Sequence, residues 1–530
     1  MNRTDGGPYG ATGGLASLGP LFQFPNRQGT GGEVLILEVT NSRTSIYGAN
    51  PQELWFLDME TKYPTAVADA KAKGIGIPEE EDTGWDGWIH LLHQPATMLP
   101  WFPTGLLPRV KRVCEKMKFV YEVHDRRMRP EEGFPEFTKT PIIDRDYQLA
   151  AADAAVKIGR GVLDMPPRSG KTRTMCEIHR RIALPTLWLA PTDRIVRQTH
   201  EVLEGFFGKH YATHLVGTKE SEEAARSHVV VCTAATAAML SPEFYKTREV
   251  ICVDEYHHAA ARSYHQDIFK KADHIFYRFG MTGTFFRSGT DEMALHALLS
   301  NVIYKVGSQE LLDRGFLVPT QVVFIPVTSP RLRGLPDNTF QGGHGKYGIQ
   351  EHKPRNQLVT WATVSLYQTG RRTLVLVGTK KQGRELEHMM SSFIRKAPEG
   401  CRFKSVEFIS TDTDRGIQGD IIESFLEGRE VKVLMGTSLL GEGVDLPTAD
   451  ALVYARGEKA EVTLTQNAYR VCTATGGKSE AIIVDFADRH NAKLMRHSLE
   501  RLSVYYNEPT FTVKALDDPN HFGAWLRERS

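Results

Sequence analysis

The sequence predicts an α/β protein with two consecutive parallel-sheet domains and a small α+β domain before them. Three observations lead to this prediction. The chain has 530 residues, which is too long for one hydrophobic core. From Asp144 onward, short apolar runs alternate with longer amphipathic stretches, as expected for buried parallel strands separated by helices. The alternation restarts at Gln321, so the second half of the chain predicts a second sheet of the same kind.

The composition is that of a globular protein, with 41% hydrophobic and 24% charged residues. The net charge is only +1, so any nucleic-acid-binding surface must be local. The six cysteines have no paired spacing, which argues against a zinc site or disulfide framework and favours a reducing cytoplasm. We find neither a signal peptide nor an apolar run that could cross a membrane, so we expect no membrane partner.

The N-terminal region divides into a flexible tail, residues 1–32, and a domain, residues 33–137. Gly, Pro, Asn and Thr dominate the tail, whereas the domain opens with the strand-like run EVLILEV at 33–39. Residues 106–118, LLPRVKRVCEKMK, predict a helix that begins at Pro108 and has one apolar face. The other face, which is either solvated or in contact with phosphates, carries Arg109, Lys111, Arg112 and Lys116.

The two α/β domains are expected at residues 138–320 and 321–488, with a C-terminal helical extension at 489–530. Residues 331–356 have little apolar content and predict an inserted loop. The strand-like runs of the first domain are 161–165, 186–191, 228–233, 249–255 and 274–284. Those of the second domain are 321–327, 373–379, 405–411, 432–438, 451–457 and 481–487.

The segment MPPRSGKT, residues 165–172, predicts a phosphate-binding loop. A strand precedes it and a helix follows, so backbone N–H groups and the helix dipole would face an anion. Lys171 would neutralise the outer phosphates, and Thr172 would offer its hydroxyl to Mg²⁺. Met165 and Arg168 stand where the usual pattern has glycine.

Two adjacent acids, Asp254 and Glu255, end the buried strand at 249–255. The carboxyl edge of a parallel sheet is where ligands bind in α/β proteins. Asp254 can hold Mg²⁺, and Glu255 can orient and deprotonate an attacking water. Solvated or helix-capping acids are the alternative, but the preceding phosphate loop favours a catalytic pair.

From about residue 140 to 490, the motifs and their order resemble the DExH-box helicases of superfamily two. The matching segments are DYQ at 146–148, MPPRSGKT at 165–172, LAPTDRIVRQT at 189–199, VVVCTAAT at 229–236, DEYH at 254–257, MTGT at 281–284, GTSLLGEGVDLP at 436–447 and TQNAYR at 465–470. The resemblance implies two RecA-like domains that use ATP and Mg²⁺.

The resemblance also implies roles for individual residues. Catalysis falls to Lys171, Asp254, Glu255, Gln466 and Arg470, the last as an arginine finger, with Gln466 reaching towards His257. The nucleotide contacts are Arg145, Tyr147, Gln148, which reads adenine, Ser169, Gly170, Lys171, Thr172 and Asp445. The Mg²⁺ ligands are Thr172 and Asp254, the coupling residues are His257, Thr282 and Thr284, and Thr192, Thr233 and Thr437 contact nucleic acid.

The last motif departs from the family pattern at two positions. Thr473 replaces a second arginine, and Tyr469 replaces a glycine. The missing first glycine, at Met165, is tolerated in this superfamily. Arg168 either supplies part of the charge lost at position 473, or points to solvent or pairs with an acid on the domain surface, and the sequence leaves these interpretations open.

The flanking segments resemble phage helicases of the UvsW branch-migration type. This narrower resemblance implies a monomeric, ATP-dependent DNA helicase or translocase that acts in recombination and repair. Its substrates would be single-stranded DNA, forks, Holliday junctions and R-loops. In an R-loop it would also contact the RNA strand. A phage-encoded protein would work in the bacterial host cytoplasm. Trp85, Trp88 and Trp101 could stack bases, although we expect at least two of them to be core residues.

Three alternatives remain. The tripeptide Glu60-Thr61-Lys62 has the acid-x-Lys spacing of a metal-dependent nuclease, as in restriction-type motors. An RNA helicase would share the same motifs. A non-catalytic nucleic-acid-binding relative would be consistent with Thr473, although the intact Lys171 and Glu255 argue against it.

Overall fold

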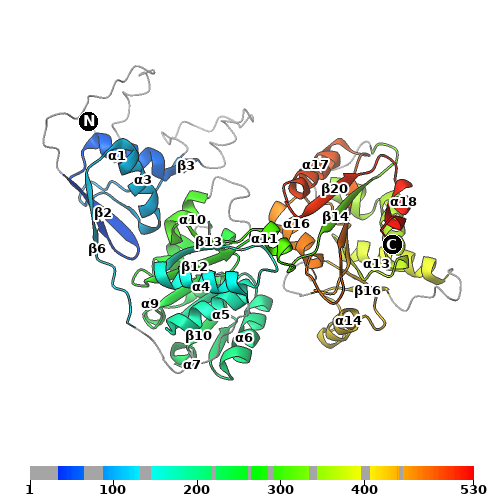
Figure 1. Cartoon of the computed structure of the whole chain (residues 1–530), viewed down its shortest axis with the longest axis horizontal. Coiled ribbons are helices and arrows are strands. Elements are labelled where there is room, and N and C mark those ends of the chain that lie inside the picture. Colours follow the sequence, from blue (N-terminus) through cyan, green and yellow to red (C-terminus); the bar gives the residue numbers. More distant parts are fainter. Residues whose placement is uncertain are drawn as a thin grey trace, which may run out of the picture.

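The computed structural model shows an N-terminal domain, two α/β lobes and a linker (Figure 1). It describes residues 34–64, 88–131, 145–217, 222–260, 264–283, 292–332, 343–395, 406–437, 440 and 446–529. The expected tail at 1–32 and the expected site or core residues Trp85, Thr284 and Asp445 lie outside these ranges. No helix among the described residues combines the length and the apolar character needed to cross a bilayer.

The N-terminal domain is a mixed sheet with two helices on one face. Its strand order is β5-β2-β1-β6, with β1 antiparallel to β2 and parallel to β6. The predicted helix is α3, in which Val110, Val113 and Cys114 are buried against the sheet. The elements are β1 Leu35–Val39, β2 Arg43–Tyr47, α1 Pro51–Thr61, β3 Lys62–Pro64, β4 Trp88–His90, β5 Trp101–Pro103, η1 Thr104–Leu106, α3 Leu107–Met117 and β6 Tyr121–Asp125.

Lobe one has a seven-stranded parallel sheet in the order β13-β7-β12-β11-β8-β10-β9. All five predicted strands are present, and the edge strands β9 and β13 are additional. Both edge strands are only partly buried, so neither forms the continuous apolar run that marks a central strand. The strands are β7 Arg160–Asp164, β8 Thr186–Ala190, β9 Ala212–Leu215, β10 Val229–Thr233, β11 Val250–Val253, β12 Tyr277–Thr282 and β13 Val302–Lys305.

Helices cover both faces of the lobe-one sheet, and α4, α5 and α6 lie side by side on one of them (Figure 1). The helices are α4 Asp146–Ile158, α5 Lys171–Ile182, α6 Asp193–Phe207, α7 Glu222–Arg226, α8 Ala234–Met239, α9 Pro242–Tyr245, η3 Tyr256–Ala260, η4 Tyr264–Phe269 and α10 Glu292–Leu299. A linker helix, α11 Ser308–Asp313, leads to lobe two.

Lobe two repeats the architecture with the order β16-β17-β15-β18-β19-β14-β20. The strands are β14 Thr320–Pro326, β15 Thr373–Leu376, β16 Val406–Ile409, β17 Val433–Gly436, β18 Ala451–Tyr454, β19 Ala481–Ala487 and β20 Phe511–Ala515. The helices are η6 Lys346–Gln350, α12 Lys353–Gln368, α13 Lys380–Arg395, α14 Arg415–Glu427, α16 Glu461–Ala468, η8 Tyr469–Val471, α17 Ala492–Tyr506 and α18 His521–Arg527. The predicted pair of parallel-sheet domains is therefore confirmed.

Two expectations for lobe two need correction. The segment 489–530 is not only helical, because β20 pairs with β14 and extends the sheet. β20 alternates half-buried and exposed residues, so it lacks the apolar run of a central strand. The expected loop at 331–356 is also partly folded. Within it, Ile349 is buried and His490 Nε2 lies 2.8 Å from the Gly348 carbonyl oxygen.

The N-terminal domain is fixed against lobe one by buried polar contacts. The Arg160 guanidinium donates hydrogen bonds to the carbonyl oxygens of Asn41, Leu298 and Leu299 at 2.8, 3.2 and 3.1 Å. Asn41 in turn donates to the His274 carbonyl oxygen at 2.7 Å. Because buried polar groups are costly to leave unpaired, this network holds the two domains in one arrangement.

A close backbone approach at Gly105 tests this interface. A Cβ at Gly105 would lie 2.0 Å from the His296 carbonyl oxygen, so Gly105→Ala forces the two domains apart. We expect the free energy of unfolding to fall by about 1–3 kcal/mol, measured by denaturant titration. The control is Gly205→Ala in α6, where no atom lies within 4 Å of the new Cβ. It should raise stability by about 0.5–1 kcal/mol. Equal changes in the free energy of unfolding of the two variants would contradict the close backbone approach at Gly105.

Candidate functional site

The predicted phosphate loop joins β7 to α5 at the carboxyl edge of the lobe-one sheet. Its Ser169 carbonyl oxygen accepts hydrogen bonds from the Tyr147 hydroxyl and the Gln148 amide, both at 2.7 Å. A Cβ on Gly170 would lie 2.2 Å from Gln148 Nε2, so this position requires glycine. The segment expected to read adenine is therefore in direct contact with the loop.

The ammonium of Lys171 faces the two acids of the neighbouring strand. Its Nζ lies 4.0 Å from Glu255 Oε1, and both side chains are largely buried. The pKa of Asp254 is raised to about 6, chiefly by burial and also by the negative charge of Glu255, while Lys171 opposes the shift. Bound Mg²⁺ would favour the ionised form of such a carboxyl. Asp254 with the Thr172 hydroxyl thus fits Mg²⁺, which usually takes few protein ligands and keeps several waters.

His257 connects the acids to the strand β12. Its Nδ1 lies 3.1 Å from Thr282 Oγ1 and 3.5 Å from Glu255 Oε2. Burial lowers the pKa of His257 to about 4, which keeps the imidazole neutral near pH 7. Its Nε2 is buried and has no hydrogen-bond partner among the described residues. The predicted coupling residues His257 and Thr282 are therefore in contact.

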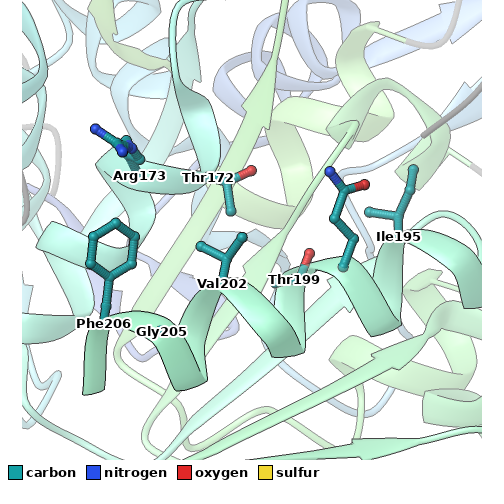
Figure 2. A pocket seen from close by; sticks show the side chains of 8 residues that line it. Thr172, Arg173, Ile195, Thr199, Val202, Gly205 and Phe206 are labelled. Atoms are coloured by element: carbon teal, nitrogen blue, oxygen red, sulfur yellow. The ribbon is translucent and has the colours of Figure 1, made fainter. Parts of the chain in front are cut away.

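A groove of about 560 Å³ runs between α5 and α6, with Thr172 among its lining residues (Figure 2). Arg173 and Phe206 also line it, with the guanidinium 5.6 Å from the ring centroid. The remaining lining residues are Ile195, Gln198, Thr199, Val202 and Gly205. The groove extends from the predicted Mg²⁺ ligand along α6.

The predicted nucleic-acid threonines of lobe one are helix caps. Thr192 accepts a hydrogen bond from Ile195 N and begins α6, and Thr233 accepts one from Thr236 N and begins α8. Both follow neighbouring parallel strands, β8 and β10, so they share one edge of the sheet. Thr437 directly follows β17 in lobe two. Helix N-termini at a sheet edge suit phosphate groups.

The last predicted motif lies on α16 and η8 of lobe two. Gln466 is half-buried and Arg470 is buried, and no described hydrogen bond joins Gln466 to His257. Tyr469 is 1% exposed and its ring packs against Phe511 of β20 at 5.7 Å. The residue that replaces the usual glycine is therefore a core residue that attaches the C-terminal strand.

Thr473 lies against the linker between the lobes. Its neighbours exchange backbone hydrogen bonds with the linker, Val318 N to Cys472 O at 2.9 Å and Ala474 N to Phe316 O at 3.2 Å. The Phe316 ring lies 4.1 Å below the Arg145 guanidinium and 5.7 Å from the Tyr147 ring. The adenine segment, the linker and the last motif thus form one continuous contact chain.

The linker residues were not identified from the sequence. Arg314 makes two 2.7 Å hydrogen bonds with the Asp146 carboxylate, and Phe316 carries the aromatic contacts. Both residues lie outside the recognised motifs, and only the way the lobes fold back brings them to α4. Hydrophobic patterning around 308–318 indicates a short helix but not its partner.

Arg168 lies on the side of the phosphate loop that faces lobe two. Burial lowers the pKa of Lys478 to about 8, and among the smaller contributions the charge of Arg168 lowers it further. The same charge acts on the pKa of Cys472, which burial raises to about 12. Arg168 also has φ +70°, a left-handed conformation that favours glycine. This explains why glycine is usual at this position.

The nuclease interpretation is not supported. Glu60 ends α1, and Arg109 donates to its carbonyl oxygen at 2.5 Å while lying 3.4 Å from its carboxylate. Lys62 is occupied by a cation–π contact with Trp88, 5.0 Å from the ring. Among the described residues, no group of three or more His, Cys, Asp or Glu could hold a metal ion. Within the part of the chain that the structure describes, Glu60 and Lys62 therefore have no third ligand beside them that would form a metal-dependent nuclease site.

The basic face and the tryptophans also differ from expectation. Arg109 is engaged by Glu60, whereas Arg112 and Lys116 are exposed and Lys111 is half-buried. Trp88 is 36% exposed, and Trp101 is half-buried and stacks on His93 at 4.0 Å. Neither described tryptophan is a core residue, since sheet and helices build the core from smaller side chains.

Comparison with known families identifies two matches. Residues 142–287 match the family described as the res subunit of type III restriction enzymes, and residues 356–474 match the helicase conserved C-terminal domain. Together they cover the predicted motifs and a large part of each α/β lobe.

Among curated relatives, the chain is 24% identical to "Putative helicase 22" of Sulfolobus islandicus filamentous virus over 50% of this chain and 47% of the relative. It therefore spans about half the length of that protein. It is 20% identical to "DNA 3'-5' translocase XPB2" of Sulfurisphaera tokodaii, over 66% of this chain and 82% of the relative.

Among solved structures, the type ISP restriction-modification enzyme LlaBIII bound to DNA superposes with a TM-score of 0.52 at 15% identity, over 74% of this chain and 32% of the enzyme. This likeness concerns the fold. The structure of T4 UvsW aligns over 91% of this chain and 99% of UvsW, with a TM-score of 0.42 at 16% identity.

The left-handed backbone at Arg168 generates a stability prediction. Arg168→Gly should raise the free energy of unfolding by about 1 kcal/mol, because glycine adopts this conformation without strain. Arg168→Ala keeps a Cβ and should not stabilise the protein. Urea titration of both variants checks this. Equal stabilisation by alanine and glycine would show that the side-chain charge, and not the backbone, carries the cost.

Proposed function

The chain belongs to the DExH-box helicases of superfamily two, and from this premise we propose that it hydrolyses ATP to move along DNA and remodel branched DNA. The substrates would be forks, Holliday junctions and R-loops, in line with the UvsW-type resemblance of the flanks. The observation that carries the proposal is the meeting of Lys171, Glu255 and His257 at one sheet edge. An acid, an ammonium group that can bind phosphate and a coupling imidazole in contact suit a nucleotide-driven motor.

Nucleotide binding would use the phosphate loop and the start of α4. Lys171 would leave Glu255 to meet the outer phosphates, and the Gln148 amide would exchange the Ser169 carbonyl for adenine. Arg145 and Tyr147 flank that position. Thr172 and Asp254 would hold Mg²⁺, which neutralises phosphate charge when bound. Asp445 would complete the nucleotide contacts from lobe two.

Hydrolysis would require the lobes to close. Glu255 would take the proton of the attacking water once Lys171 turns to the phosphates. Arg470 would approach from lobe two as the arginine finger, and Gln466 would offer a partner for the buried His257 Nε2. Arg168 lies near residues 472–478 and would add positive charge where Thr473 has none.

Coupling to nucleic acid would run through His257 and Thr282, whose side chains touch, and on to Thr284. A strand would pass along the carboxyl edges of the sheets at Thr192, Thr233 and Thr437. Their backbone N–H groups would bind phosphates, which positions the motor without reading sequence.

The remaining features of the proposal concern the setting. We place the protein in the cytoplasm, of the bacterial host if it is phage-encoded, and expect a monomer. Arg109 is held by Glu60. The exposed Arg112 and Lys116 and the half-buried Lys111 of α3 would contact phosphates outside the motor path.

Two substitutions separate binding from chemistry. Lys171→Ala removes the phosphate contact, so it should weaken ATP binding and reduce turnover at least about 100-fold. Glu255→Gln removes the base but keeps the shape, so it should bind ATP, close and retain nucleic acid while turnover falls about as far. Fluorescent-nucleotide binding and phosphate release measure the two effects. Parent-like turnover in Glu255→Gln would eliminate Glu255 as the base.

The substrate is tested by ATPase stimulation. Single-stranded DNA, single-stranded RNA and a four-way DNA junction are compared at equal nucleotide concentration. We expect both DNAs to stimulate hydrolysis more than RNA, with the junction the most effective at low concentration because it offers several contact sites. Preferential stimulation by RNA would identify an RNA helicase instead. Nucleic-acid binding without any hydrolysis would identify a non-catalytic relative.

A further inference from the structure

A cleft of about 1590 Å³ separates the N-terminal domain from lobe one. On the lobe-one side, Glu249 precedes β11 and Arg278 lies near the start of β12. Asp254 and Thr282 stand at the opposite ends of these two strands. The cleft therefore opens at the amino edge of the sheet, whereas the nucleotide site lies at its carboxyl edge.

The size of the cleft indicates a polymer rather than a small molecule. Pockets for small ligands typically enclose roughly 300–1,000 Å³, and this cleft is larger. Both walls contribute to it, from residues 40–43 and 126–130 of the N-terminal domain to residues 269–274 of lobe one. A chain segment could run along the boundary between the domains.

The lining carries an excess of positive charge. Arg43 and Lys270 are exposed, one on each wall, and neither forms an ion pair with any described carboxylate. The Arg126 side chain is 64% exposed beside Glu38. Arg129 adds another guanidinium group, whereas Arg127 is paired with the Asp125 carboxylate at 2.6 Å, and the acids of the lining are Glu249 and Asp273. Such a lining favours a polyanion.

Aromatic side chains stand among these cations. Trp101 lines the cleft, and His93 covers one of its faces, with ring centroids 4.0 Å apart and planes 20° from parallel. Burial lowers the pKa of His93, which favours the neutral form of the stacked imidazole. Tyr63 and the 39% exposed Ile89 lie on the same wall. Aromatic faces beside a basic track are what unpaired bases bind.

The walls are already in place. Arg129 donates to the Tyr277 hydroxyl and to the Val156 carbonyl oxygen at 2.8 and 2.9 Å. With Arg160, Asn41 and Gly105, it holds the N-terminal domain on lobe one. A cleft that needs no rearrangement loses little free energy to ordering when it binds.

We propose that this cleft binds a single strand of nucleic acid at a site separate from the path through the two lobes. Arg43, Lys270 and Arg126 contact successive phosphates, and Trp101 stacks on a base. The use of this site during DNA remodelling rests on the proposed function, since a motor that holds one strand in the cleft can pull on the other strand of the duplex. The binding itself needs neither ATP nor hydrolysis.

The test measures binding of a fluorescent oligothymidylate of about 10 nucleotides, without nucleotide, over a range of salt concentrations. In Arg43→Glu/Lys270→Glu, we expect affinity to fall about tenfold or more and the salt slope to fall by about 1.4, since each lost single-strand contact removes about 0.7. Lys209→Glu/Lys514→Glu is the matched control, because both lysines are exposed and neither lines the cleft.

A second variant pair tests stacking. Trp101→Ala should weaken oligonucleotide binding roughly tenfold, whereas Trp101→Phe should retain most of the affinity. Cross-linking of a 4-thiothymidine oligonucleotide should label the peptide that contains Trp101. Thermal unfolding midpoints equal to that of the parent show that each variant is folded.

Four results would overturn the proposal. They are parent-like binding by Arg43→Glu/Lys270→Glu, a loss seen only in Arg112→Glu/Lys116→Glu on α3, tighter binding of duplex than of single strand, and displacement by poly-glutamate at equal charge. The Lys171→Ala protein should bind the oligonucleotide through the cleft like the parent. If the protein shows no ATPase activity but still binds the oligonucleotide in the cleft, the proposed motor function is wrong and the proposed binding site is still supported.

Discussion

The parallel pairing of β7, β12 and β11 determines where each predicted catalytic group stands. Thr282 pairs with Asp164, and Met165 N donates to the Thr282 carbonyl oxygen at 2.9 Å, so the phosphate loop begins beside the coupling segment. A Cβ on Gly283 would meet Pro167 at 2.8 Å, so the two segments pack backbone to backbone. The acids after β11 are one strand away. Register alone thus gathers residues that are more than 100 positions apart in the chain.

The linker gives this site a connection to lobe two. Phe316 lies between the Arg145–Tyr147 pair and the backbone of Ala474, so movement of one shifts the other. The Asp146–Arg314 pair is exposed and contributes little stability by itself. Its bidentate geometry nevertheless fixes the position of the linker relative to the start of α4. The start of α4, where we propose the adenine contacts, and the last motif are therefore connected through Phe316.

Much of this arrangement could be predicted from the sequence because buried central strands leave apolar runs and catalytic loops leave motifs. Lys171, Asp254, Glu255, His257 and Thr282 all lie at one edge, as their positions after predicted strands imply. What the sequence does not reveal arises between segments. In the sequence, Tyr469 is only a departure from a motif. The structure explains it, because its ring packs against Phe511 of β20. Likewise, Arg168 looks anomalous until its left-handed backbone and its proximity to residues 472–478 are known.

Lobe one presents different chemistry at its two sheet edges. β7 begins with Arg160, which holds the N-terminal domain, and ends with Asp164 beside the predicted phosphate loop, a span of about 13 Å. Both walls of the basic cleft lie within the N-terminal domain and lobe one, and the hydrogen bonds described between these walls join the same two domains. Closure of lobe two would reshape the carboxyl edge and leave the amino edge unchanged. A strand bound in the cleft would therefore stay anchored to lobe one throughout the nucleotide cycle, while the strand at the carboxyl edge moved relative to it.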